Sequence, residues 1–259
     1  MDAFFEPAGD GRYFAGPFTG GPWDPRMQHG GPVSALLARA LTDHEPVDGQ
    51  QLARVSFELL RPVPIGPMRI STRTGRAGRK VSLVDAVLTD DDGSELILAR
   101  AWRLQPTPPS VSSTLGPSSM PPASSVEPAD RGFEDRIPGF MRGVEVRFTS
   151  GHFSEQGPGA AWFRLRVPLV EGTPMRATDP VCIAADCGNG ISGVLDFTRY
   201  VYINPDLTVH LARLPDAEWV GLEAETVVSP DGISVATGRL QDARGQLGRT
   251  IQTLFVAER

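Results

Sequence analysis

The feature that most constrains the fold of this chain is an internal repeat. When the chain is shifted along itself by 152 residues, several residues fall on an identical residue. The coinciding pairs are Leu59 with Leu211, Arg61 with Arg213, Leu88 with Leu240, Asp90 with Asp242 and Gly93 with Gly245. A repeat of this length within 259 residues predicts two copies of one folding unit rather than a single large domain.

A tract rich in Pro and Ser separates the two copies. It covers residues 105–130 and lacks the apolar periodicity of a helix or a strand. Such a composition is typical of a linker. We therefore expect an N-terminal unit over residues 1–104 and a C-terminal unit over residues 131–259.

Both units show a helical segment accompanied by short strand-like runs. Apolar residues recur at i, i+3, i+4 and i+7 over residues 33–41, which predicts a helix, and a second helical segment opens at Asp179 and Pro180. Antiparallel strands around one helix in each unit form an α+β fold rather than alternating βαβ units. The strand-like runs cover residues 53–60, 68–75, 80–89, 95–104, 143–148, 161–167, 200–203, 208–213, 219–228, 234–241 and 248–256.

Composition and charge exclude several classes of protein. Hydrophobic residues make up 40% of the chain and charged ones 22%, as in an ordinary globular protein. The formal net charge is -6 and no basic run interleaves with aromatic residues, which argues against a nucleic-acid partner but not against a small anionic ligand. The first ten residues do not resemble a signal peptide, and no run approaches the roughly 18 apolar residues of a membrane span. We expect a cytoplasmic protein.

Several catalytic motifs are missing from the sequence. There is no G-x-S-x-G or HExxH motif, and the four histidines have no Ser or Cys in a recognisable context, so neither a nucleophilic triad nor a metal site is expected. Cys182 and Cys187 are expected to be reduced packing residues. Residues 188–193 match G-x-G-x-x-G, but the β-branched and aromatic run after them argues against a dinucleotide-binding unit. A flat helix face or a helix cap explains these glycines.

Two features have both a structural and a functional interpretation. Asp186 lies in an otherwise apolar segment, where a carboxylate is either on the helix surface or partly buried with hydrogen-bond partners. Gly30 and Gly31 precede the first helix, where they form a tight turn or let a ligand approach the N–H groups of the helix. The residues alone leave both choices open.

Taken in order, a set of short motifs resembles the acyl-CoA thioesterase II family. The resemblance covers roughly residues 20–104 and 140–259, and it implies two tandem hotdog folds, a double hotdog in which antiparallel sheets each wrap a central helix. The motifs are His29-Gly30-Gly31-Pro32-Val33, Ser56-Phe57-Glu58-Leu59-Leu60-Arg61-Pro62, Gly78-Arg79-Lys80-Val81, Ala185-Asp186, Asn204-Pro205-Asp206-Leu207-Thr208 and Thr250-Ile251-Gln252.

The same resemblance implies that Asp186, Asn204 and Gln252 hold a water that attacks the thioester carbonyl without an acyl-enzyme. A carboxylate can act as general base while two amides orient the water. Asn204 stands where well-known members of the family have Thr, and Thr208 and Asp206 are alternatives for that position. No cofactor is implied, because coenzyme A is part of the acyl-CoA substrate.

Further residues are candidates for holding the substrate. His29, Gly30 and Gly31 would place helix N–H groups at the developing oxyanion, and Thr208 is a further polar candidate. Each basic candidate for the CoA phosphates is also explained as a solvated surface charge, and each aromatic candidate for the acyl group as core. The phosphate candidates are Arg61, Arg79 and Lys80, with Arg213 as the repeat counterpart of Arg61, and the acyl candidates are Phe18, Trp23, Phe57 and Trp102.

Two other functions stay open beside acyl-CoA hydrolysis in fatty acid metabolism. A hotdog pair can bind acyl-CoA or another acyl ligand without hydrolysing it, and failure of Asp186 and Gln252 to converge would favour that function. A hotdog hydratase acting on enoyl-CoA would need an Asp and a His five residues apart on a loop into the helix. Asp24 and His29 have this spacing but precede the helix with Gly-Gly between. The resemblance also implies a homo-oligomer, because exposed sheet edges favour assembly.

Overall fold

The structure of the chain is a computed structural model, and part of the linker lies outside its description. The predicted end of the linker at residue 130 and the predicted start of the C-terminal unit at residue 131 are outside the described residues. The structure describes residues 2–107, 110, 112–129, 139–216 and 218–259.

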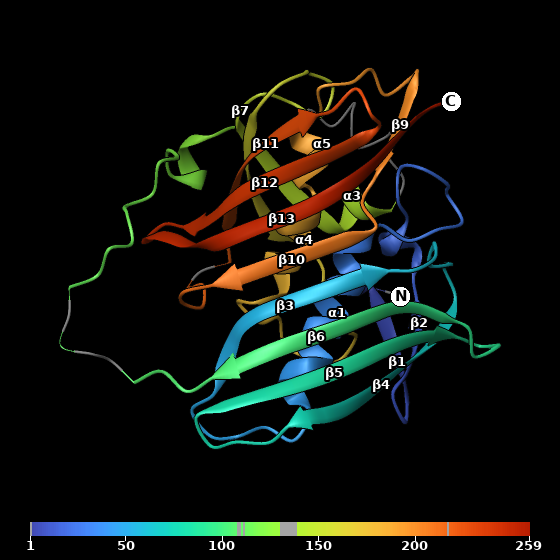
Figure 1. The fold of residues 1–259 in the computed structure, drawn as a ribbon, viewed down its shortest axis with the longest axis vertical. Coiled ribbons are helices and arrows are strands. Elements are labelled where there is room, and N and C mark those ends of the chain that lie inside the picture. The colour runs from blue at the N-terminus through green and yellow to red at the C-terminus, as the bar shows by residue number, and fades with distance from the viewer. Residues whose placement is uncertain (1, 108–109, 111, 130–138, 217) are drawn as a thin grey trace.

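The described strands form one continuous antiparallel sheet (Figure 1). Their order is β1-β2-β4-β5-β6-β3-β10-β13-β12-β11-β8-β7, and β9 pairs with β13 beside this path. β3 and β10 join the two halves, because they pair antiparallel from Glu58 with Asp206 to Arg54 with His210. The order of the six strands from either edge to this junction is the same in both halves, so the sequence repeat is also a repeat of topology.

The strand bounds show how closely the halves correspond. β5 and β12 are separated by the same 152 residues at both ends. The strands of the first half are β1 (Phe5–Gly9), β2 (Arg12–Ala15), β3 (Gln51–Leu59), β4 (Pro67–Arg76), β5 (Val81–Asp90) and β6 (Glu95–Leu104). Those of the second half are β7 (Val144–Ser150), β8 (Gly159–Leu165), β9 (Tyr200–Ile203), β10 (Asp206–Leu211), β11 (Val220–Val228), β12 (Ile233–Asp242) and β13 (Gly245–Glu258).

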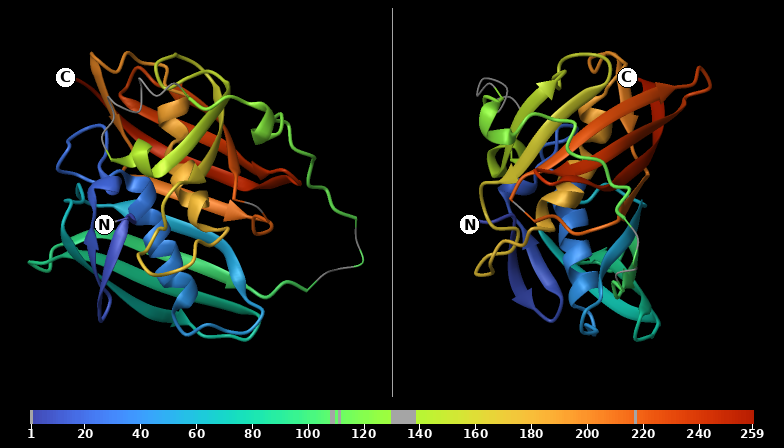
Figure 2. Two further views of the ribbon diagram at one scale, coloured as in Figure 1. Left: turned by 180° about the vertical axis from the view of Figure 1, so that it is seen from behind. Right: turned by 90° about the vertical axis from the view of Figure 1, so that its left-hand side faces the viewer.

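The helices lie on the concave side of the sheet (Figure 2). α1 begins after His29, whose Nδ1 accepts a hydrogen bond from the backbone N–H of Gly31 and so caps the helix. α4 packs against α1, and a break at Cys187 separates α4 from the short α5. The helices are α1 (Gly30–Asp43), α3 (Phe140–Gly143), α4 (Asp179–Asp186) and α5 (Gly188–Ile191), with 3-10 turns η1 (Pro17–Thr19) and η2 (Ala123–Ser125).

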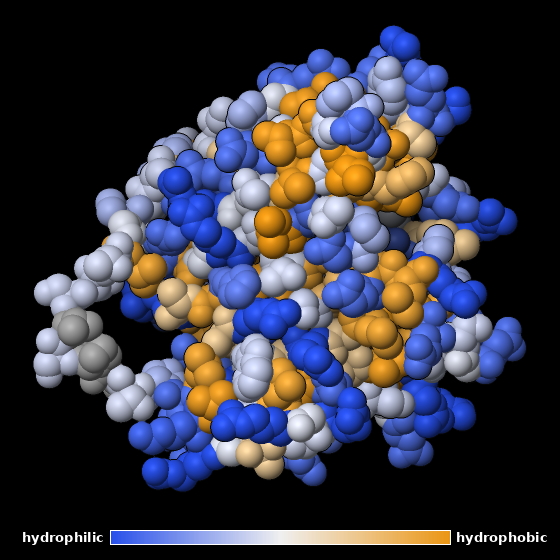
Figure 3. Space-filling model, viewed as in Figure 1, coloured by the Kyte–Doolittle hydropathy of each residue, from blue (hydrophilic) through white to orange (hydrophobic). Residues whose placement is uncertain are grey.

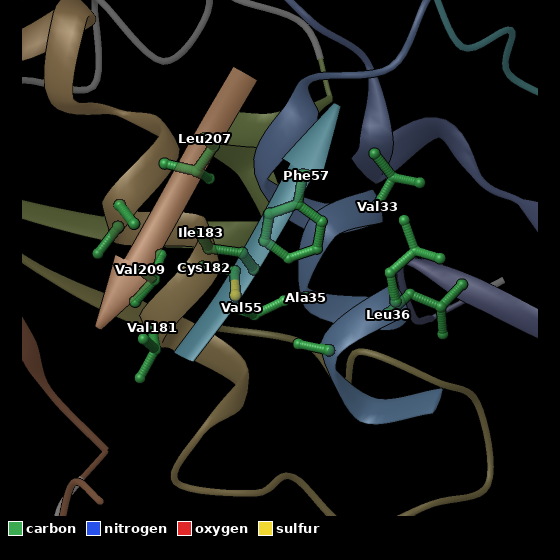
Figure 4. Close-up of a cluster of buried hydrophobic side chains, with 14 of the residues drawn as sticks. Val33, Ala35, Leu36, Val55, Phe57, Val181, Cys182, Ile183, Leu207 and Val209 are labelled. Carbon is green, nitrogen blue, oxygen red and sulfur yellow. The ribbon is translucent and has the colours of Figure 1, made fainter. Parts of the chain in front are cut away.

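The core lies between the two helices and the central strands, as Figure 4 shows. Phe57 of β3 and Leu207 of β10 are fully buried and face α1 and α4, where Leu36 and Ile183 are also buried. Successive side chains of a strand point to opposite faces, so alternate residues of β3 and β10 point away from the helices. This alternation decides which polar residues of the central strands can reach the helices.

The helical and strand-like segments expected from the sequence are confirmed, with some differences at their ends. α1 begins at Gly30, before the predicted start at residue 33, because the His29 cap lies ahead of the apolar stripe. β1 and β2 were not predicted, since few of their residues are buried and the alternation is weak. The second part of the linker packs on the C-terminal half, where Trp162 donates its Nε1–H to the Pro121 carbonyl at 2.9 Å. Within the described chain, no helix has the length and apolar character needed to cross a bilayer.

Candidate active site

Asp186 is the last residue of α4, and its carboxylate is buried against the first turn of α1. Only 5% of this residue is exposed. A Cβ atom on Gly30 would lie 2.8 Å from Asp186 Oδ2, so the glycine is what allows the carboxylate to approach the helix so closely. The positive end of the α1 dipole therefore faces a buried negative side chain.

Two amide side chains donate to the same oxygen of this carboxylate. Asn204 Nδ2 lies 2.9 Å from Asp186 Oδ1, and Gln252 Nε2 lies 3.4 Å from it. Gln252 is buried on the face of β13 that points toward the helices, whereas Asn204, between β9 and β10, is half-buried. The structure thus brings together the three residues that the sequence indicated as catalytic, and a water bound there would meet a carboxylate and two amides.

The orientation of Gln252 is fixed by a residue that the sequence did not single out. The backbone N–H of Asn189 donates to Gln252 Oε1 at 3.1 Å, which leaves Gln252 Nε2 directed at Asp186. Gly188 permits this contact, since a Cβ there would lie 2.8 Å from Gln252 Oε1. In the sequence, the only signal for the contact of Asn189 with Gln252 was the glycine motif over residues 188–193. This motif does not form a dinucleotide-binding site, because the residues before the glycines form a helix and not a strand.

His29 is a fourth member of the cluster. Its Nδ1 lies 3.0 Å from Asp186 Oδ2 and 3.0 Å from the backbone nitrogen of Gly31. The ring is held flat against Phe140 at a centroid distance of 4.1 Å and an interplanar angle of 5°. One ring nitrogen carries either a hydrogen or a lone pair, so Nδ1 can donate to Asp186 or accept from Gly31 but not both.

The predicted oxyanion and phosphate residues are distributed unevenly. Gly30, Gly31 and His29 lie at Asp186, as described above. Arg61 is exposed in the loop after β3, and hydrogen bonds from Gln28 N to Val63 O and from Leu59 N to Pro205 O place this loop beside His29 and Asn204. Arg61 therefore lies on the rim of the site.

Arg79 and Thr208 are not brought to Asp186. Gln50 Nε2 donates to the Arg79 carbonyl, which places Arg79 at the beginning of β3. Arg61 follows the other end of β3. The nine residues of this strand, at about 3.3 Å of rise per residue, therefore separate Arg79 from Arg61. Thr208 pairs with Ile251 on the outer face of the sheet, while Gln252 points inward. The alternation of the strand thus removes Thr208 as a substitute for Asn204.

The aromatic residues expected to line an acyl slot occupy different environments. Phe57 belongs to the core, and Trp102 lies on the outer face of β6, opposite Leu83. Phe18 packs partly buried against the core and Phe4. Trp23 stands at the surface, next to Phe197 and Tyr202, in a cluster that the sequence did not predict. Trp23 and Phe197 stack at 4.7 Å, and the guanidinium of Arg259 lies over both rings.

Other chemistry near Asp186 is limited. Cys182 and Cys187 are buried free thiols, and burial, together with the negative charge of Asp186, raises the pKa of Cys187 well above its ordinary value. A thiol in this environment is a poor nucleophile. Among the described residues, His, Cys, Asp and Glu form no group of three or more arranged to hold a metal ion.

Two further findings concern residues outside the cluster. Asp24 is bound by the Arg26 guanidinium at 2.7 Å, so the Asp24–His29 pair considered for a hydratase is not formed. A surface hollow of about 460 Å³, lined by residues that include Met175, Arg176 and Pro180, lies at the beginning of α4, whereas Asp186 ends that helix. None of the predicted catalytic residues lines this hollow.

Comparison with known families matches nearly the whole chain. The family described as "Acyl-CoA thioesterase N-terminal domain" matches residues 19–104. The family described as "Acyl-CoA thioesterase C-terminal domain" matches residues 117–256, which is more than half of the chain. No curated protein matches the sequence.

Solved structures resemble the chain over almost its full length. One is a putative thioesterase II from Thermobifida fusca YX, with a TM-score of 0.77, 20% identity and coverage of 99% of this chain and 96% of that one. The TesB protein of Mycobacterium avium subspecies paratuberculosis has a TM-score of 0.69 and 17% identity, with coverage of 98% of this chain and 96% of that one. The acyl-CoA thioesterase II TesB2 of Mycobacterium marinum has a TM-score of 0.66 and 12% identity, with coverage of 98% of this chain and 95% of that one. At these identities the likeness shows the fold, a double hotdog, as the sequence predicted.

Proposed function

Because this chain belongs to the acyl-CoA thioesterase family, we propose that it hydrolyses acyl-CoA thioesters to a fatty acid and free coenzyme A. The observation that carries this proposal is the convergence of Asn204 and Gln252 on one oxygen of the buried Asp186 carboxylate. A protein that only binds acyl ligands does not require a carboxylate held in this way.

The proposed reaction uses a water as the nucleophile. The Asp186 carboxylate removes a proton from the water while the amides of Asn204 and Gln252 orient it, and the water oxygen bonds to the thioester carbon. The tetrahedral intermediate then expels the thiolate of coenzyme A, which takes up a proton. One water is consumed, and one carboxylic acid and one thiol are formed, with no acyl-enzyme.

The negative charge that develops on the carbonyl oxygen needs a hydrogen-bond donor. The backbone N–H of Gly31 is directed at His29 Nδ1 in this structure. When Nδ1 carries a proton and donates to Asp186, that N–H is released and becomes available for the oxyanion. His29 in this scheme positions Asp186 and controls the Gly31 donor.

The substrate would approach from the rim formed by the loop after β3 and the aromatic cluster. Arg61 is the basic residue on this rim that suits a CoA phosphate, because its side chain is exposed beside the loop that leads to His29. Its repeat counterpart, Arg213, is bound to Asp242 at 2.5 Å and serves the fold instead.

The test is a thiol-release assay over saturated acyl-CoAs from short to long chain, with an enoyl-CoA added to detect hydration. We expect hydrolysis by the wild type and a fall in kcat of about 10²–10⁴-fold for Asp186→Asn and Gln252→Ala. Circular dichroism spectra of both variants control for folding. Release of no thiol from any substrate by the wild type would refute the proposal, and binding without turnover would favour a carrier of acyl groups.

A further inference from the structure

Beyond Gln252, the inner face of β13 lines a small pocket, which we call the Ser234 pocket. Leu254, the next inward-facing residue of β13, lies ~7 Å along the strand from Gln252 and lines it. Its volume is about 10 Å³, which is room for roughly one water. The apolar part of its wall consists of Val194, Leu195, Tyr202, Val228, Leu254 and Val256.

One wall of this apolar pocket carries a hydroxyl group with no partner. Ser234 is 2% exposed, and its Oγ forms no hydrogen bond to any described residue. Ser234 lies directly opposite Leu254 in the pairing of β12 with β13. A buried hydroxyl without a hydrogen-bond partner is destabilising, so a partner from outside the chain would be stabilising here.

The other half of the molecule shows that the fold does not require this pocket. Ser82 is the repeat counterpart of Ser234, and it lies opposite Arg103 as Ser234 lies opposite Leu254. Arg103 Nε donates to Ser82 Oγ at 3.1 Å, and Ser82 Oγ donates to Gln50 Oε1 at 2.5 Å. The half without Asp186 thus fills the position and satisfies the serine, whereas the half with Asp186 leaves both space and a free hydroxyl.

The pocket also has an apolar connection to the surface. Tyr202 lines it and contacts Trp23 edge-on at a centroid distance of 5.7 Å. Trp23 and Phe197 are 40% and 42% exposed, so the aromatic cluster continues from solvent to the pocket wall. An apolar chain with its carbonyl at Gln252 would therefore meet apolar surface on the side of Leu254.

We propose that the Ser234 pocket takes at most the terminal carbon of the acyl group, or a hydroxyl or oxo oxygen on it that binds the Ser234 hydroxyl, and so restricts the enzyme to short acyl thioesters. This inference rests on the proposed thioesterase function and names its substrate class. The limit on length follows from the single inward step between Gln252 and Leu254 and from the small volume beyond it.

Steady-state hydrolysis of acetyl-, butyryl-, octanoyl- and 3-hydroxybutyryl-CoA tests the proposal, because ratios of kcat/KM cancel losses of active protein. Leu254→Ala enlarges the pocket and should raise the octanoyl-to-butyryl ratio about tenfold or more. Val228→Ala, at a partly exposed position of the same wall, should shift the ratio in the same direction if Leu254→Ala fails to fold. Ser234→Ala should lower the 3-hydroxybutyryl-to-butyryl ratio about fivefold to tenfold.

Ser82→Ala is the matched control and should leave both ratios unchanged, because Ser82 belongs to the other half. If the wild type hydrolyses thioesters and the pocket variants leave both ratios at the wild-type value, the inference is wrong and the thioesterase function stands. If the wild type hydrolyses none, the thioesterase function fails. In that case calorimetry gives Kd values for non-hydrolysable alkyl-CoA thioethers of the same chain lengths. A change in the long-to-short ratio of Kd in Leu254→Ala supports the proposed pocket, and a ratio equal to that of the wild type overturns the proposal.

Discussion

The two oxygens of the Asp186 carboxylate face different partners, and this division gives each neighbour a separate task. Oδ1 accepts from the Asn204 and Gln252 amides, whereas Oδ2 faces His29 and Gly30. A water activated by this carboxylate would be oriented on the amide side. The imidazole on the other side then determines which hydrogen bonds hold the carboxylate in place.

Replacement of His29 by Asn separates its two contacts. Asn is as good a helix N-cap as any residue, so His29→Asn should keep the bond from Gly31 and change the melting temperature little. Loss of the imidazole beside Asp186 should lower kcat about 10–100-fold. His29→Ala, which loses the cap as well, should in addition be less stable by about 1 kcal/mol in urea unfolding. Full activity in His29→Asn would limit the histidine to capping.

The sequence predicted which residues gather at the candidate site better than it predicted the contacts between them. Asp186, Asn204 and Gln252 could be selected because ordered motifs resemble a known family. The contact of His29 with Asp186 could not, because it depends on the packing of α1 against α4, which lie about 150 residues apart in the chain. Thr208 was selected by proximity in sequence to Asn204, and the alternation of β10 places it on the wrong face.

At the level of the helix, Gly30 controls how closely α1 approaches Asp186. An alanine there would place Cβ 2.8 Å from Asp186 Oδ2, so Gly30→Ala must displace the carboxylate. We expect kcat/KM to fall about 10–100-fold, because small displacements of a catalytic group are costly.

The matched control for this change is Gly190→Ala in α5. Its Cβ would meet only the Phe153 ring, at an ordinary distance of 3.7 Å. Gly190→Ala should retain activity within about twofold, since alanine favours a helix and nothing must move. Equal losses in the two variants, measured by thiol release, would show that the effect does not come from Asp186.

The turn between β12 and β13 makes part of the stability dependent on pH. Burial raises the pKa of Asp242, but hydrogen bonds from Arg213 and from the backbone N–H groups of Arg244 and Asp216 lower it more, so its pKa lies below the ordinary value. A carboxyl with a lower pKa in the folded state stabilises the fold above the pKa of the unfolded state, about 3.9, and this contribution is lost as the pH falls through the folded pKa.

Asp242→Asn should therefore have a free energy of unfolding lower by roughly 2–4 kcal/mol at pH 7, and so a lower melting temperature than the wild type. Its stability should also depend less on pH below about pH 4 than that of the wild type. Asp90→Asn is the control, because among the described residues the side chain of its counterpart Asp90 accepts from the backbone of Asp92 and Ser94 and from no arginine. Parallel acid profiles for wild type and Asp242→Asn in calorimetric melts would contradict this assignment.

Sequence periodicity predicted most elements because their burial is one-sided. In β5, buried and partly exposed residues alternate, which is the pattern that identifies a half-buried strand. β1 has only its first residue buried and shows no such pattern. The pairing of β3 with β10 could not be predicted from either strand alone, because it depends on the fit between the two halves.

Across the whole molecule, the two halves share a topology but differ in what they do with equivalent positions. Arg213 is bound to Asp242, while Arg61 is left exposed at the rim of the candidate site. Arg39 of α1 binds Asp179 of α4 at 2.5 Å, with both side chains buried, which fastens the helices together at the end away from Asp186. Duplication thus leaves one half to build the carboxylate site and the other to supply the helix end that it faces.

The outer face of the C-terminal half exposes an apolar patch that suits self-association. Figure 3 shows hydrophobic residues gathered over the region where Figure 1 draws β9 and β11–β13. Phe255 lies between Ile233 and Ile203 in the strand pairing, so the side chains form one surface. The exposed fractions are 65% for Val227, 62% for Ile233, 57% for Phe255, 44% for Ile251 and 41% for Ile203.

A contiguous exposed patch of this kind marks an interface in many proteins, and a second copy of the chain is the partner that the family resemblance predicts. We expect sedimentation velocity to show an oligomer for the wild type and a smaller species for the double variant Ile233→Lys, Phe255→Lys, because two buried charges would oppose association. Leu104→Lys, at an exposed apolar position of the N-terminal half, is the control and should sediment like the wild type. A wild type that sediments as a monomer at all concentrations, or a double variant that keeps the wild-type size, would exclude this face as the interface.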